Sequence, residues 1–309
     1  MTSSDRVAAS SPAGSIYDLG YRHYEGKRNG RPYAVWSLFV ESVRGVWGFG
    51  RPMSAKAAPF ILLGLFALPS LVQLAFASVI VQNAAASGQT PELLTYHSYF
   101  IDFDFLVFFF CVAQAPELVC RDQRYQVLPL YFTRAMGRAD YALARLMSLV
   151  VSLFIVLMVP VVALFIGDVL LKPDTFSAIG DELPLALPAV PAYLVVAASL
   201  AAISLTVSSF TPRRAYAAIG LVAYVLLMEA IPSAVDSIGT RANWGWTGPI
   251  GLIRPMTTLH GATDWFFGRA IDPSDYTGSL TPENFLVAAL VSVALFAGVL
   301  VYRYRRMPA

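Results

Sequence analysis

The chain has 309 residues, of which 57% are hydrophobic and only 14% are charged, and its formal net charge is +2. A soluble domain usually carries about 25% charged residues, so this composition predicts a membrane protein. The small net charge, with no dense basic stripe, argues against nucleic acid as a partner.

The N-terminal part, 1–56, is polar and charged over too long a stretch to be a cleavable signal peptide. The first apolar run is therefore expected to stay in the membrane. We expect 1–32 to form a cytoplasmic extension, whose Lys27, Arg28 and Arg31 suit either anionic lipid or a protein partner.

The segment 33–50 (YAVWSLFVESVRGVWGFG) places apolar side chains at helical spacing along one face, opposite Ser37, Glu41, Ser42 and Arg44. This pattern predicts a helix that lies in the membrane interface, with tryptophans at headgroup depth. The alternative, packing against a soluble domain, would need a domain that this sequence does not contain. The apolar face consists of Trp36, Phe39, Val40, Val43 and Trp47.

Six further stretches are apolar enough to cross a bilayer as helices, which takes about 20 residues each. They make 51–309 an all-α integral membrane domain. The second is the weakest because it carries Asp102 and Asp104, and Pro184, Pro188 and Pro191 predict an irregular start to the fourth. The small residues of the fourth predict close helix packing. The six stretches are 57–82, 98–116, 146–167, 184–209, 215–235 and 284–302.

The distribution of basic residues predicts the orientation. Cytoplasmic loops are enriched in Lys and Arg, so both termini are expected in the cytoplasm, with the protein in the cell (plasma or inner) membrane. The long loop between the fifth and sixth spans, roughly 236–283, then lies outside. Two structures stay open for it: one or two short re-entrant or surface helices, or an ordinary extracellular loop. The inner segments, which hold 18 of the 22 Lys and Arg, are 1–56, 117–145, 210–214 and 303–309.

A charged stretch, PELVCRDQRYQVLPLYFTRAMGRADY (116–141), separates the second and third spans. Arginines and tyrosines surround its apolar centre, which is the composition of a protein interface. The enrichment of basic residues in cytoplasmic loops explains the arginines but not the apolar centre. We expect Glu117 to pair with Arg121 at i, i+4. The residues expected to contact a partner are Glu117, Arg121, Asp122, Arg124, Tyr125, Leu128, Leu130, Tyr131, Arg134 and Arg138.

The order of these elements, together with this stretch, resembles the membrane subunits of ABC transporters of the type-2 exporter class. YDLGYRHYEG (17–26) also resembles N-terminal extensions of actinobacterial members. The motif positions are Pro116, Glu117, Arg121, Asp122, Leu128, Leu130, Tyr131, Arg138, Tyr141, Arg145 and Leu146.

The resemblance implies a permease that is not itself an enzyme. A coupling helix within 117–140 would dock on a dimer of ATPase subunits, which bind ATP and magnesium. A second copy or a related permease would supply the other half of the pathway. The sequence agrees, because it contains no G-x-x-x-x-G-K-[ST] loop for nucleotide phosphates. No cofactor is expected in this chain.

Polar residues within the spans are candidates for the translocation pathway, because an ionisable group in hydrocarbon is costly. The candidates are Gln73, Asp102, Asp104 and Glu229. The three acids lie toward the outer ends of their spans, where contact with water is the more ordinary explanation.

The remaining reactive side chains suggest no catalytic chemistry. Cys111 and Cys120 are expected to be reduced packing residues. His23, His97 and His260 show no ligand spacing, so no metal site is expected. A membrane-embedded enzyme, or a carrier or scaffold outside the ABC class, is the alternative function.

Overall fold

The computed structural model describes residues 26, 29–87, 93–132, 136–172, 174–242, 244, 248–270 and 280–307, and every regular element within them is a helix. Six stretches of these helices are long and apolar enough to cross a membrane, which confirms the number predicted. The elements are α1 (Arg31–Val46), α2 (Met53–Ser87), α3 (Ser98–Arg124), α4 (Leu128–Phe132), α5 (Arg138–Leu171), α6 (Thr175–Ala186), α7 (Ala189–Ser209), α8 (Arg214–Arg241), η1 (Gly248–Ile253), α9 (Pro255–Phe266) and α10 (Pro282–Arg306).

Each predicted span except the fourth lies within a single helix. The fourth is divided into α6 and α7, and Pro188 occupies the position just before α7. Because a proline inside a helix removes a backbone donor and clashes with the preceding turn, this break confirms the predicted irregular start. Several helices, such as α3 and α10, also continue past the apolar stretch into charged residues, up to Arg124 and Arg306.

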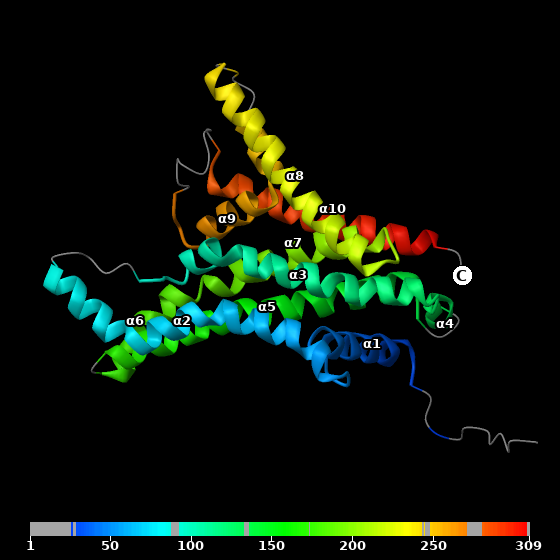
Figure 1. Ribbon diagram of the computed structural model, residues 1–309, viewed down its shortest axis with the longest axis horizontal. Helices are drawn as coiled ribbons and strands as arrows, with labels where there is room; N and C mark the ends of the chain where they lie inside the picture. The colour runs from blue at the N-terminus through cyan, green and yellow to red at the C-terminus, as the bar shows by residue number, and fades with distance from the viewer. Residues whose placement is uncertain are drawn as a thin grey trace, which may run out of the picture.

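Helix α7 lies at the centre of the bundle. It packs against α10, α5, α3, α8 and α9. Its small side chains, including Ala197, Ala201, Ala202 and Ser204, are buried and allow this close approach. Figure 1 shows α3, α5 and α7 running side by side along the long axis. Helices α1 and α4 and the C-terminal end of α10 share one end of the molecule, hereafter the α4 end.

Two short helices, η1 and α9, lie between α8 and α10, so the described part of this loop does contain short helices, and their re-entrant or surface location stays a prediction. Gly268, with φ of 63°, follows α9 and allows a Schellman turn, in which Arg269 donates to the Asp264 carbonyl at 2.9 Å. Gly261 lets α9 approach α10 closely, because a Cβ there would lie 2.5 Å from Cγ of the buried Phe285.

Helix α1 packs on α5 through a ridge formed by Leu38, Ser42 and Val46. The prediction that placed Ser42 on the polar outer face was wrong. Its hydroxyl donates to the Leu38 carbonyl and accepts a hydrogen bond from α5, which satisfies it inside the protein. The location of α1 in a membrane interface stays a prediction.

The apolar face predicted for α1 is only partly outward. Trp36 is exposed, and Phe39, Val40 and Val43 are half-buried. Trp47, predicted at headgroup depth, is buried instead, with its ring centroid 5.6 Å from that of Phe60 and 5.9 Å from that of Phe110.

The turn after α1 explains why Trp47 points inward. Gly48 has φ of 70°, and a Cβ there would lie 2.8 Å from the Ala55 carbonyl oxygen. The chain therefore folds back tightly on the start of α2 at a position that requires glycine.

Candidate functional site

The chain turns sharply between α3 and α4. Gln126 lies in the left-handed region with φ of 52°. The amide of Val127 donates to the Asp122 carbonyl at 3.1 Å, and that of Gln126 donates to the Gln123 carbonyl at 3.2 Å. This is the Schellman pattern that ends a helix, here with glutamine where glycine is usual.

The α4 segment, residues 125–132, comprises this turn and helix α4, and burial divides it into an inner and an outer side. Leu128 is buried, and the ring of Tyr131 packs on that of Tyr141 in α5, with centroids 5.5 Å apart. Tyr125 and Leu130 point outward and are each 66% exposed. The segment thus presents an aromatic and an aliphatic side chain at the surface while its other side is anchored in the bundle.

A buried ion pair joins three helices directly behind α4. Asp122 of α3 pairs with Arg145 of α5 and accepts a hydrogen bond from the Tyr141 hydroxyl at 2.6 Å. Arg145 also donates to Ser42 of α1 at 2.9 Å. Burial and the nearby Asp122 carboxylate raise the pKa of Tyr131, so its phenol stays protonated. These bonds tie α1, α3 and α5 together where α4 attaches.

Further bonds fasten the flanks of the same end. Arg31 of α1 forms a two-pronged ion pair with Asp140, at 2.7 and 2.8 Å. The side chain of Arg138 donates to the Arg305 carbonyl of α10 at 2.9 Å. Arg138 is therefore an internal tie in the structure, whereas the predicted contact residue Arg134 lies outside the described residues.

The carboxylate of Glu117 joins α3 to two other segments. It pairs with Arg51, just before α2, and with Arg214, the first residue of α8, at 2.9 Å. The predicted local pair with Arg121 was wrong, because two arginines distant in the chain approach the same carboxylate. Arg121 is exposed and forms no ion pair within the described part of the chain.

Two cavities open beside these arginines, with volumes of about 520 and 350 Å³. The residues that line both are Arg51, Glu117, Arg121 and Tyr125. The larger extends toward Glu41 and Leu130, and the smaller toward α8. Both lie at the α4 end of the bundle.

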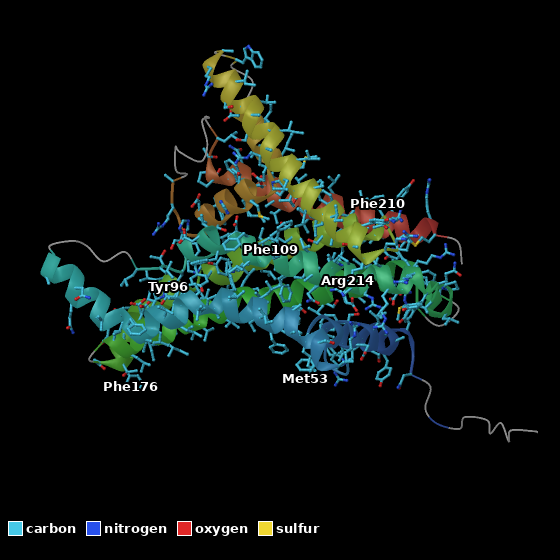
Figure 2. All side chains as sticks on the ribbon, viewed as in Figure 1. Met53, Tyr96, Phe109, Phe176, Phe210 and Arg214 are labelled. Carbon is cyan, nitrogen blue, oxygen red and sulfur yellow. The ribbon has the colours of Figure 1, made fainter. Side chains whose placement is uncertain are left out.

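A row of side chains on one face of α3 runs from the smaller cavity along the helix. We call this row the α3 stripe. From Phe105 onward its members recur every three or four residues, which places them on one side of a helix. Phe105 and Phe109 in its middle are 49% and 50% exposed. Figure 2 shows Phe109 partway along α3, with Arg214 nearer the α4 end. The stripe consists of Asp102, Phe105, Phe109, Ala113, Glu117, Arg121 and Arg124.

Of the four pathway candidates, only Asp102 is exposed, and it lies on this stripe. Gln73 is buried, and its side-chain amide exchanges two hydrogen bonds with the backbone of Leu94, at 2.7 and 3.1 Å. The structure therefore gives Gln73 an internal role, fixing the chain that leads into α3.

Glu229 is also engaged internally. Its carboxylate pairs with Arg254 at 3.0 Å and accepts hydrogen bonds from the amide of Met256 at 2.6 Å and the hydroxyl of Thr257 at 3.3 Å. Since the first amides of a helix lack partners within it, this acid from α8 caps the start of α9.

Replacing Glu229 with alanine is expected to lower the free energy of unfolding by about 1–3 kcal/mol, because Met256 and Arg254 lose a charged acceptor. Thermal unfolding of the purified protein measures this. Glu229→Gln keeps an acceptor oxygen but not the charge, so its unfolding midpoint should lie between those of the wild type and Glu229→Ala. Equal midpoints for all three proteins would contradict the assignment.

Asp104 belongs to a cluster that the sequence did not predict. His260 of α9 bonds to it at 2.9 Å, and His97 bonds to Asp264 of α9 at 2.5 Å. The two His–Asp pairs thus join the start of α3 to α9. A local hint existed, because His260 and Asp264 are four residues apart and so share one face of a helix.

The remaining reactive groups form no recognisable centre. Cys111 and Cys120 are free and buried. Among the described residues, no group of three or more His, Cys, Asp and Glu could hold a metal ion. Comparison of the sequence with known protein families and with curated proteins finds no match.

Proposed function

We propose that this chain is the membrane permease subunit of an ABC exporter of the type-2 class, driven by a separate ATPase through the α4 segment. The observation that carries the proposal is the construction of that segment. Tyr125 and Leu130 are exposed on it, while Leu128 is buried and anchors it. Exposed aromatic and apolar residues among arginines are typical of a docking surface.

The support behind α4 suits transmission of a movement. Asp122, Arg145 and Ser42 bond across α3, α5 and α1, so a load applied to α4 acts on these helices together. In the proposed cycle, ATP and magnesium bind to the ATPase dimer, whose closure displaces α4. The bundle then shifts as a unit, because breaking a buried ion pair costs about 3–5 kcal/mol.

The α3 stripe is the proposed lining of the pathway. Its aromatic centre would face lipid in a single chain, whereas a second copy or a related permease would enclose it. Helices α2 and α8 both pack on α3 and would flank this lining. The expected orientation places the α4 end in the cytoplasm, where ATP is available.

The test is recovery of a Walker-motif ATPase with the tagged chain from its native cells. Leu130→Asp and Tyr125→Ala together should abolish co-purification, because they remove the apolar side chains proposed to contact the ATPase. Both side chains are exposed, so the fold should be unaffected. Leu128→Asp is a poorer choice, since that residue is buried and its change would disturb folding. Phe176→Asp on α6, 90% exposed at the opposite end, is the matched control and should retain the ATPase. Undiminished recovery with the double variant would refute docking through α4.

The alternative of a membrane-embedded enzyme gains no support from the His–Asp pairs. A nucleophilic mechanism needs a hydroxyl or thiol bonded to the imidazole. In the described residues, Nε2 of His97 and Nε2 of His260 each bond to a carboxylate, and Nδ1 of His97 has no hydrogen-bond partner.

A further inference from the structure

We propose that the smaller cavity binds the acidic headgroup of an amphiphile whose apolar tail lies along the α3 stripe. This inference rests on the proposed function and names its substrate class, an anionic lipid-like molecule. Two features support it: the cavity is lined by arginines, and the exposed aromatic residues of the α3 stripe lead into it.

The cavity is cationic. Its volume of about 350 Å³ lies within the range of about 300–1,000 Å³ typical of ligand sites. One acid, Glu117, faces four arginines, so the charged lining sums to +3. The arginines are Arg51, Arg121, Arg124 and Arg214.

Glu117 organises this lining without neutralising it. Arg51 and Arg214 both pair with its carboxylate, and Arg214 also donates to the Ala113 carbonyl at 3.3 Å. A guanidinium has five N–H donors, so each retains donors for a further anion. Arg121 and Arg124 form no ion pair within the described residues. The arrangement suits the oxygens of a phosphate or sulfate ester, which arginine binds in two-pronged geometry.

The α3 stripe supplies the apolar part of the site. Phe105 and Phe109 are half-exposed, and Ala113 separates them from Glu117. From Phe105 to Glu117 the helix rises about 18 Å, the length of a lipid tail lying along it. The Arg214–Ala113 bond places a guanidinium where the apolar part ends. A small free anion would use the cavity but not the stripe, so continuity of the two favours an amphiphile.

Binding can be measured on the full chain alone, purified in a neutral detergent. Dioleoylphosphatidylglycerol, with an anionic headgroup, should raise the thermal unfolding midpoint in a saturable manner, because a ligand that binds only the folded state stabilises it. Dioleoylphosphatidylcholine should not. Arg121→Gln with Arg124→Gln should weaken the apparent affinity for phosphatidylglycerol at least tenfold, and Phe109→Ser should weaken it to a lesser degree.

A matched control removes the same charge outside both cavities. Arg44→Gln with Arg306→Gln, exposed residues of α1 and α10, should leave the affinity unchanged. Three results would overturn the proposal: an equal shift with phosphatidylcholine, an equal loss of affinity in the control, or a full shift with inorganic phosphate alone. The last would indicate an anion site without a tail.

This experiment contains no ATPase, so its failure leaves the α4 docking test untouched. Conversely, a failed docking test alongside saturable phosphatidylglycerol binding would leave the site standing and remove its role in transport. Transport itself is measured as the appearance of labelled phosphatidylglycerol in the outer leaflet of vesicles that contain the chain and its ATPase.

Discussion

Replacing Arg145 with methionine is expected to lower the free energy of unfolding by about 3–5 kcal/mol, because it leaves a buried carboxylate without its cation. The side chains of Arg145 and Asp122 are only 10% and 13% exposed, so water cannot compensate. Ser42 and Tyr141 would lose their shared neighbour as well. The thermal midpoint in detergent should fall by an amount on the order of 10 °C.

The paired variant separates loss of charge from loss of packing. Asp122→Asn with Arg145→Met removes both charges and should restore most of the midpoint, since no ion then stays unpaired. Arg145→Lys keeps the charge but not the planar guanidinium, so its thermal midpoint should lie between those of the wild type and Arg145→Met. A double variant as unstable as Arg145→Met alone would show that packing, and not charge pairing, holds this end together.

Replacing Gly261 with valine is expected to separate α9 from α10. Even a single Cβ would lie 2.5 Å from Cγ of Phe285, which is fully buried. Overpacking of this kind costs about 1–3 kcal/mol, and more where the neighbour cannot move. Here Phe285 is fully buried and has little room to move, so a loss of about 3 kcal/mol or more is expected.

Gly298 provides the matched control for this prediction. It lies in α10, the partner of α9, and a Cβ there meets nothing within 4 Å. Gly298→Ala should therefore stabilise the helix slightly, by up to about 1 kcal/mol, because alanine is the better helix former. Thermal unfolding of both variants makes the comparison. Equal stability of Gly261→Val and the wild type would mean that α9 and α10 are not in contact.

The helical architecture was predictable because each span is a local property of the sequence. Largely apolar runs mark the six candidate spans, and three prolines, Pro184, Pro188 and Pro191, indicated the irregular start of the fourth. The short helix within 117–140 was expected from the family resemblance. Local composition predicted an exposed apolar centre there, which holds for Leu130 but not for Leu128, which is buried. For the spans and the irregular start of the fourth, the interactions that determine the structure lie within a few residues of one another.

The partnerships between helices were not predictable in the same way. Glu117 was matched with its neighbour Arg121 because a single sequence offers only local pairs, yet its partners lie 66 and 97 positions away. His97 meets Asp264 across 167 positions. Trp47 was assigned to lipid because its spacing fitted an apolar face, and only the turn at Gly48 directs it inward.

The attachment of α9 to α3 has a mechanical consequence. Phe103, with φ of −124° and ψ of 19°, is a knee in α3. The two His–Asp pairs straddle it, because His97 lies before the knee and Asp104 after it, and both partners lie on the rigid rod of α9. A change in the bend at Phe103 must lengthen the distance between His and Asp in at least one pair. Helix α9 therefore holds the bend in α3 at a fixed angle. The rest of α3 can move about Phe103 only when at least one of the two His–Asp pairs breaks.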